Sequence, residues 1–190
     1  MVIIISGPSG AGKTTVCKEL LKEDEKLLYS VSATTRGKRK GEKEGVDYYF
    51  ISEEEFKKWK KEGRFLETAK VHNYYYGTLK DFIIKGEKEK KDILLDIDVK
   101  GKINVSKKIK NTVSIFLLPP TMEEAVKRIK KRNKEKEEEI KKRLETALYE
   151  IKEIKKFDYL VMNIDLKETV NIVKAIILAE RHKVKNLKGG

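Results

Sequence analysis

A glycine-rich segment directly after an apolar run constrains the fold of this chain more than any other feature. Residues 7–14 read G-x-x-x-x-G-K-T, and residues 2–5 before them are all apolar. In this pattern the backbone N–H groups surround the phosphates of a nucleotide, and the lysine reaches the terminal phosphates. A strand should precede such a loop and a helix should follow it, and residues 13–23 suit a helix. A glycine-rich turn without a ligand is the alternative. The segment therefore predicts a nucleoside triphosphate site, but it does not identify a reaction.

Four continuous apolar runs indicate buried strands at residues 2–6, 92–98, 112–118 and 157–163. Segments with helical character lie between and after them, at 13–23, 101–110, 121–152 with an interruption, and 166–183. Continuous apolar strands that alternate with helices are typical of a parallel sheet covered on both faces. We therefore expect an α/β fold with three αβα layers and a mostly parallel central sheet.

Residues 32–90 interrupt this alternation with polar, turn-rich pieces and an aromatic cluster. Only 52–63 reads as a clear helix there, with Ser52 as N-cap and Glu55 completing a capping box. We expect an inserted substrate-binding subdomain at about 32–80 and a mobile lid at about 129–140, where charges are dense. The core of a single domain would then comprise 1–31, 81–128 and 141–190, a length that suffices for a sizeable core.

A net charge of +13 raises the question of a nucleic-acid partner. The lysine-rich stretches mix both signs, as exposed helix faces do, and no basic stripe with interleaved aromatic residues stands out. We therefore expect no nucleic-acid partner. The one cysteine, Cys17, cannot form an internal disulfide, and we expect it to pack in the core rather than to act as a nucleophile. No apolar run reaches the length of a membrane span, so we expect a cytoplasmic protein without a membrane partner.

Arginine is rare in this chain, and its positions are informative. Only seven of the 44 basic residues are arginines. Arg36 and Arg39 lie in a polar segment without helical periodicity, whereas Arg128, Arg132 and Arg143 flank the charged excursion. A guanidinium group matches phosphate oxygens with two parallel hydrogen bonds, which an ammonium group cannot do. Two arginine groups and a phosphate loop suit phosphoryl transfer between two phosphorylated ligands; surface arginines without a role are the alternative.

Acidic and aromatic side chains form the remaining candidate sites. Glu67 precedes a run of three tyrosines at 74–76, and a carboxylate there could accept the paired N–H donors of guanine, which adenine lacks. Asp96 and Asp98 stand near the carboxyl end of a predicted strand, where open α/β sheets bind their ligands. The alternative for the tyrosines is that they are ordinary half-buried strand residues, and this applies to Tyr48 as well. The alternative for the aspartates is a purely structural carboxylate at the end of a strand.

Five segments in order resemble the motifs of the guanylate kinase family. They read ISGPSGAGKTT, SVSATTRGKRKGEKEGVDYYF, FLETAKVHNYYYGT, ILLDIDVKG, and IFLLPP followed by KRIKKRN, and the resemblance runs from residue 2 to about 182. It implies a P-loop kinase that moves a phosphoryl group from MgATP to GMP, giving ADP and GDP. It leaves the use of dGMP and the oligomeric state open.

The resemblance also implies roles for individual residues. The implied ATP-binding residues are Gly7, Pro8, Ser9, Gly10, Ala11, Gly12, Lys13, Thr14, Thr15 and Asn163, with Thr14 also holding Mg²⁺. The implied ligands of the GMP phosphate are Arg36, Arg39, Tyr48 and Tyr76. The residues implied at the guanine are Ser32, Glu67, Thr78 and Asp98, with Asp96 close by. The implied catalytic cations are Lys13, Arg128, Arg132 and Arg143.

Three positions depart from the family pattern. Lys38 stands where the family commonly has proline, Lys100 where it more often has glutamine, and Ile164 where an acidic residue usually follows Asn163. None of these changes removes a group that phosphoryl transfer needs. Two other functions remain open at this point: a phosphopeptide-binding module of the same fold, and a related kinase with another phosphorylated acceptor, such as a ribose bisphosphate.

Overall fold

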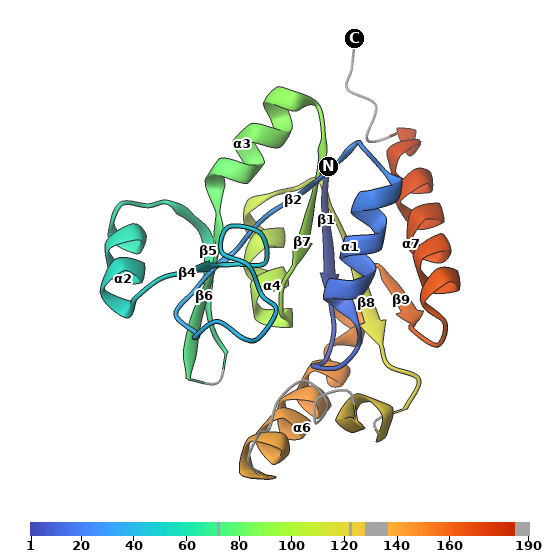
Figure 1. Ribbon diagram of the computed structural model, residues 1–190. Coiled ribbons are helices and arrows are strands. Elements are labelled where there is room, and N and C mark those ends of the chain that lie inside the picture. Colours follow the sequence, from blue (N-terminus) through green and yellow to red (C-terminus); the bar gives the residue numbers. More distant parts are fainter. Residues whose placement is uncertain (72, 122, 128–136, 185–190) are drawn as a thin grey trace.

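The computed structural model of the chain describes residues 1–71, 73–121, 123–127 and 137–184, of which 137–144 are described without their side chains. Its main sheet has five parallel strands in the order β2-β7-β1-β8-β9 (Figure 1). The bounds are β1 Val2–Ser6, β2 Leu27–Tyr29, β7 Asp92–Asp96, β8 Thr112–Leu118 and β9 Tyr159–Met162. The predicted α/β fold with a parallel central sheet is confirmed.

The alternating side chains of β1 divide the core into two layers. Ile3 and Ile5 pack toward helices α1 (Lys13–Glu23) and α7 (Leu166–Arg181). Val2 and Ile4 pack on the other face, with Leu95 and with Val105 of helix α4 (Val99–Lys108). Because both faces of the sheet are covered, its strands can be apolar throughout, which explains the continuous runs in the sequence.

A smaller sheet lies beside the main one, at the left of Figure 1. Its strand order is β4-β3-β6-β5, and its bounds are β3 Ala33–Thr34, β4 Tyr49–Phe50, β5 Phe65–Val71 and β6 Tyr74–Leu79. Helix α2 (Glu53–Lys61) covers it with Phe56, which stacks on Phe65 with ring centroids 4.6 Å apart. As predicted, Ser52 caps α2, accepting the backbone N–H of Glu55 at 3.1 Å.

The prediction of a single helix in residues 32–90 is wrong, because a second helix, α3, spans Lys80–Glu89. The side chain of its N-cap residue, Leu79, makes no capping hydrogen bond, and a glycine lies within the helix, so the sequence offers weak signals. The glycine has a packing reason: a Cβ at Gly86 would lie 2.0 Å from Ile93 Cδ1 of β7. Packing against the main sheet thus stabilises α3, although the sequence of this segment has only a weak preference for a helix.

The other predicted helices are found with shifted ends. Helix α4 begins at Val99 rather than 101, and α7 ends at Arg181. Within the predicted helical region 121–152, residues 123–127 are helical and α6 spans Glu137–Lys152, followed by the 3₁₀ turn Ile154–Lys156. Most of the predicted lid, 129–136, lies outside the described residues. Among the residues that are described, no helix has both the length and the apolar character to cross a membrane.

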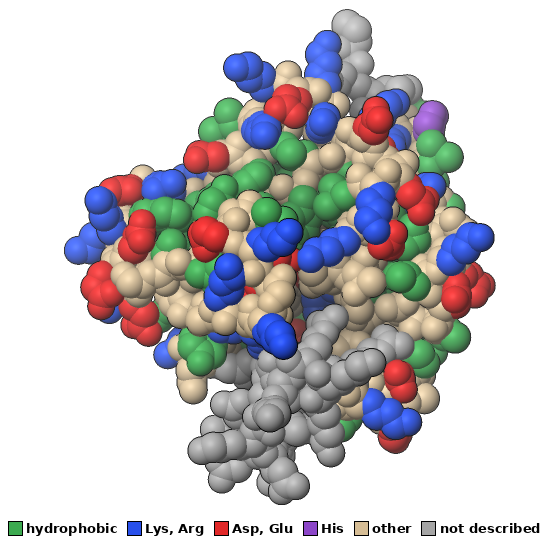
Figure 2. All heavy atoms as spheres, viewed as in Figure 1, with side chains coloured by type: hydrophobic (Ala, Val, Ile, Leu, Met, Phe, Trp, Pro, Cys, Tyr) green, Lys and Arg blue, Asp and Glu red, His purple; other side chains and the backbone are tan. Residues whose placement is uncertain are grey.

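Charged side chains are distributed unevenly over the face shown in Figure 2. Toward the left and right of this face, acidic groups are interspersed among lysines and arginines, whereas several basic groups gather near its centre. This mixture fits the interpretation that solvated helix faces account for much of the positive charge.

Candidate functional site

The glycine-rich loop connects β1 to α1 and packs against the neighbouring strand β8. Gly7 has a φ of 138°, and a Cβ there would lie 2.1 Å from the carbonyl oxygen of Leu117. Gly12, the N-cap of α1, has a φ of 91° and supplies no side chain to cap the helix. The first N–H groups of α1 therefore point toward the loop, where they and the helix dipole favour an anion.

Lys13 folds back over this loop. Its Nζ donates to the carbonyl oxygens of Gly7 at 2.6 Å and Pro8 at 3.3 Å. These contacts hold a half-buried ammonium group next to the amides of the helix N-terminus. A phosphate that enters the loop would offer this group a charged acceptor in place of two neutral ones, which makes a stronger hydrogen bond.

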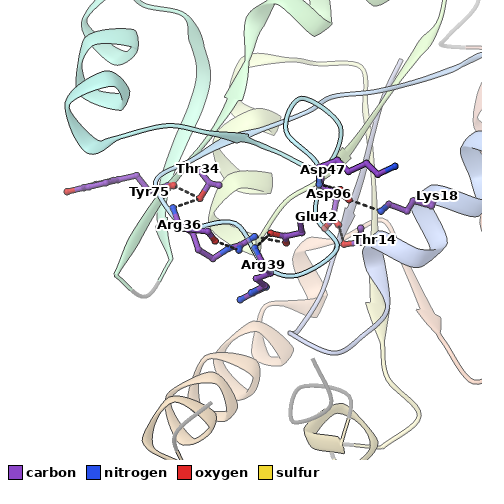
Figure 3. Close-up of polar contacts among 11 residues, drawn as sticks. Thr14, Lys18, Thr34, Arg36, Arg39, Glu42, Asp47, Tyr75 and Asp96 are labelled. Atoms are coloured by element: carbon purple, nitrogen blue, oxygen red, sulfur yellow. Dashed lines mark hydrogen bonds and ion pairs between the residues drawn. The ribbon is translucent and has the colours of Figure 1, made fainter. Parts of the chain in front are cut away.

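Thr14 and Asp96 meet beside the loop (Figure 3). The Thr14 hydroxyl donates to Asp96 Oδ2 at 2.8 Å, because β7 lies next to β1 and its last residue, Asp96, reaches the start of α1. The sequence interpretation grouped Asp96 with the guanine-binding residues, but the structure shows it in contact with the phosphate loop. A hydroxyl and a carboxylate are hard oxygen ligands of the kind that Mg²⁺ accepts.

Asn163 is buried at the end of β9 and braces the loop. Its Nδ2 donates to the carbonyl oxygen of Ala11 at 2.7 Å, and its Oδ1 accepts the hydroxyl of Thr169 at 3.1 Å. Its side-chain amide is thus engaged within the protein, whereas the resemblance implied a position near adenine. Ile164, which follows it, is 68% exposed, and the acidic Asp165 caps α7 by accepting the N–H of Glu168.

Arg36 is the centre of a second charged cluster, on the smaller sheet. Its Nη2 donates to Glu42 Oε1 at 2.8 Å and its Nη1 to the carbonyl oxygen of Gly37 at 2.6 Å. Glu42 Oε2 accepts the backbone N–H of Arg39 at 2.8 Å, so one carboxylate holds both predicted phosphate-binding arginines (Figure 3). Burial favours the neutral acid, but the hydrogen bonds from Arg36 and Arg39 outweigh it and lower the pKa of Glu42. Glu42 is not among the predicted site residues, although it lies in the same polar segment as both arginines.

Two tyrosines border the Arg36 cluster. The Tyr48 ring lies 5.4 Å from Arg36 Cζ and meets the ring of Tyr76 edge-on, with centroids 6.0 Å apart. Tyr76 sits opposite Thr34 in the smaller sheet, which brings it to the same side as Arg36. Burial raises the pKa of Tyr48 far above its ordinary value, so its hydroxyl keeps its proton. Together these groups provide hydrogen-bond donors for an anion.

Glu67 and Thr78 form a buried polar pair between β5 and β6. The Thr78 hydroxyl donates to Glu67 Oε1 at 2.8 Å, while Glu67 Oε2 is buried without a hydrogen-bond partner in the described part of the chain. Burial raises the pKa of Glu67 to about 7, and the nearby charge of Asp98 adds to this shift. A buried carboxylate oxygen without a partner is costly, and a ligand with N–H donors would satisfy it.

Two of the predicted guanine-binding residues also have structural contacts. Asp98 caps α4, because its Oδ1 accepts the backbone N–H of Gly101 at 2.8 Å, and burial raises its pKa. Asp98 Oδ1 therefore has a structural role, which was the alternative to ligand binding for this residue. Ser32 is buried beside β3, and its carbonyl oxygen accepts the N–H of Tyr49 at 2.9 Å.

Helix α6 adds a carboxyl group that the sequence analysis missed. Glu150 is 8% exposed, and burial raises its pKa to about 7, with Lys13 opposing the shift and Asp98 adding to it. Of the predicted lid arginines, Arg128 and Arg132 lie outside the described residues. Arg143 belongs to α6, but its side chain is not among those described.

Comparisons with known proteins place this geometry in a family. A profile of the guanylate kinase family matches residues 1–180. The chain is 49% identical to a guanylate kinase of Caldanaerobacter subterraneus over 97% of this chain and 89% of that protein. It is 48% identical to a guanylate kinase of Thermotoga maritima, over 96% of this chain and 88% of that protein. The crystal structure of guanylate kinase from Anaplasma phagocytophilum superposes with a TM-score of 0.82 at 35% identity, covering 97% of this chain and 87% of that chain.

Proposed function

Because the chain belongs to the guanylate kinase family and transfers a phosphoryl group from ATP to GMP, we propose a division of its site into two halves. The phosphate loop forms the ATP half. The Arg36 cluster and the Glu67 pocket form the GMP half. The observation that carries the proposal is the buried Glu67 oxygen, which has no hydrogen-bond partner among the residues that the structure describes, because guanine offers two adjacent N–H donors to such an acceptor.

In the ATP half, the residues 7–15 surround the phosphates, and Lys13 exchanges its carbonyl partners for phosphate oxygens. Thr14 and Asp96 would hold Mg²⁺, which neutralises charge on the ATP phosphates when it is bound. Asn163 holds the loop in shape through Ala11 and lies on the ATP side.

In the GMP half, Arg36 and Arg39 bind the acceptor phosphate, and the hydroxyls of Tyr48 and Tyr76 donate to it. Glu67 accepts the two N–H donors of guanine, with Thr78 orienting it; Ser32 and Asp98 complete the pocket. Glu42 keeps Arg36 oriented until the phosphate arrives, since the carboxylate already fixes the guanidinium plane.

The chemistry requires alignment more than a base. A phosphate oxygen of GMP, already anionic, forms a bond to the γ-phosphorus of ATP, while the bond from that phosphorus to the bridging oxygen breaks and its electrons go to ADP. Lys13 and the arginines stabilise the charge that moves during this step.

Arg128, Arg132 and Arg143 would supply donor-side cations from a lid at about 129–140. Closure of this lid and of the 32–80 subdomain over the core would exclude water and limit ATP hydrolysis.

We infer a cytoplasmic location, where ATP and GMP are both available; the single cysteine, which cannot form an internal disulfide, agrees with it.

A panel of acceptors tests the guanine pocket. With saturating MgATP, the turnover of GMP, dGMP, AMP and UMP is measured in a coupled assay for ADP. GMP should be turned over far better than AMP and UMP, and dGMP should be turned over about as well as GMP, because no group assigned to the acceptor pocket recognises the ribose 2′-hydroxyl. Turnover of AMP equal to that of GMP would contradict the role assigned to Glu67.

A further inference from the structure

An ion pair joins the helix of the ATP half to the segment of the GMP half. Lys18 Nζ of α1 lies 2.6 Å from Asp47 Oδ1, which belongs to the loop before β4 (Figure 3). Lys18 is five residues after Lys13 on the same helix, and Asp47 directly precedes Tyr48 of the Arg36 cluster. The pair therefore connects two elements that bind different substrates.

Asp47 is built into the acceptor segment rather than lying loosely on its surface. Its side chain is only 8% exposed, and its Oδ2 accepts the backbone N–H of Lys43 at 2.8 Å. The backbone N–H of Asp47 also donates to the carbonyl oxygen of Lys43 at 3.0 Å, which closes the turn 43–47. Any displacement of the Asp47 carboxylate would therefore move this turn, and Tyr48 with it.

The electrostatics of the pair favour a charged, fixed contact. Burial favours the neutral form of Asp47, but the hydrogen bond from Lys18 and that from the Lys43 N–H outweigh it and lower the pKa of this carboxyl group. Lys18 keeps its ammonium partly in water, with 54% of its side chain exposed, so it pays little desolvation. A half-buried pair of this kind couples two elements more firmly than an exposed pair does.

The two halves are also close enough for such coupling to matter. Thr14, which contacts Asp96, and Lys18, which pairs with Asp47, are four residues apart on α1 and therefore lie on one face of that helix. A small shift of the turn 43–47 would therefore change the position of the acceptor phosphate relative to the donor phosphates, and phosphoryl transfer depends steeply on that alignment.

We propose that the Lys18–Asp47 ion pair is a positioning contact that holds the acceptor-phosphate segment against the donor helix. Neither side chain touches a substrate in this role. The inference rests on the proposed acceptor site at Arg36, Arg39, Tyr48 and Tyr76.

Steady-state kinetics of three variants test the contact. Lys18→Met keeps the aliphatic stem and removes the charge, and Lys18→Arg keeps the charge. Lys22→Met is the matched control, because Lys22 lies on the same helix and its ion pair in the described part of the chain is a local one, with Glu19. We expect Lys18→Met to raise the KM for GMP about tenfold, with the KM for ATP changed less than about twofold. Lys18→Arg and Lys22→Met should stay near the original values.

A double-mutant cycle separates coupling from general damage. Asp47→Asn leaves an oxygen for the N–H of Lys43 and removes the charge that Lys18 needs. If the pair acts as a unit, the double variant should have the same KM for GMP as either single variant. Additive effects, an equal rise of both KM values, or a lowered Tm with an unchanged KM for GMP would each overturn the inference.

The proposed acceptor site has its own control. If Arg36→Met leaves the KM for GMP unchanged, the acceptor site itself is wrong. If Arg36→Met raises that KM and Lys18→Met does not, the acceptor site stands and the positioning role of the ion pair fails.

Discussion

At Glu67, burial and ligand recognition place opposite demands on one carboxyl group. Burial raises its pKa to about 7, which favours the protonated form in the free protein. The paired N–H donors of guanine require the ionised form, because a protonated acid would place a hydrogen against one of them. Binding of GMP is thus linked to loss of a proton whenever the pH lies below about 7.

This linkage predicts a pH dependence of the KM for GMP. The KM should be lowest above about pH 7 and should rise by up to about tenfold per pH unit as the pH falls below the pKa of Glu67. In Glu67→Gln the KM should be high at every pH, much more so than the KM for ATP, and this component of the pH dependence should disappear. The phosphate of GMP also titrates near pH 6, to about the same extent with both proteins, so the difference between the two profiles isolates Glu67. Parallel profiles would refute the linkage.

At the scale of elements, the junction of β9 and α7 supports the phosphate loop. Asn163 directly follows the last residue of β9, accepts a hydrogen bond from Thr169 of the helix, and donates one to the carbonyl oxygen of Ala11 in the loop. Asn163→Asp would replace the Nδ2 donor by an oxygen that faces the Ala11 carbonyl. We expect the KM for ATP to rise by a factor equivalent to about 1–3 kcal/mol, with a much smaller effect on GMP. Ile164→Ala, at the exposed neighbouring position, is the control; equal changes in the two variants would contradict the bracing role.

The end of α7 is tied to the main sheet by a second polar cluster. Arg181 donates to Asp92 at 2.6 Å and pairs with Asp24 at 2.8 Å, and Asp92 also holds the N-terminal amine at 3.0 Å. All three side chains are largely buried, so removing the arginine leaves the poorly solvated Asp24 carboxylate without its cation and leaves Asp92 with the N-terminal amine alone.

Arg181→Met should therefore lower the free energy of unfolding by about 3 kcal/mol while leaving kcat within about twofold. Denaturant unfolding monitored by fluorescence of the single tryptophan measures the loss. Lys174→Met is the comparison, since Lys174 pairs with Glu23 at the exposed surface and should cost less than about 1 kcal/mol. A similar loss in both variants would show that the burial of the Arg181 cluster contributes nothing.

At the scale of the whole molecule, the single cysteine reports on global opening. Cys17 is fully buried between α1 and the sheet, and burial raises the pKa of its thiol well above the ordinary value. The thiolate is the reactive form, so the native protein should react with a thiol reagent only as fast as it unfolds. Labelling in increasing denaturant should follow the unfolding transition. Rapid labelling of the native protein would contradict the core position and would revive the nucleophile interpretation.

Four of the five strands of the main sheet could be predicted because they are continuous, mostly apolar runs that alternate with helices. The edge strand β2 was missed, because it has only three residues. Strands β3 and β4 of the smaller sheet could not be predicted, since they have two residues each and exist only through pairing with partners far along the chain. Helix α3 was missed for a related reason: it contains Gly86, which weakens the helical signal and allows close packing against Ile93 of β7. Local sequence carries little information about an element whose stability comes from tertiary contacts.

The candidate site divides in the same way. The phosphate loop is determined by local sequence, because its glycines adopt backbone angles that other residues rarely reach and its lysine and threonine follow at a set spacing. Arg36 and Arg39 could be chosen from the sequence because arginine is rare in this lysine-rich chain. Glu67 could be chosen because it precedes the tyrosine run 74–76 and matches a motif of the family. Tertiary structure alone decided that Asp96 meets Thr14, that Asn163 braces Ala11, and that Lys18 reaches Asp47. These contacts join residues 29 or more positions apart, and only the packing of the sheets and helices brings such residues within hydrogen-bond distance.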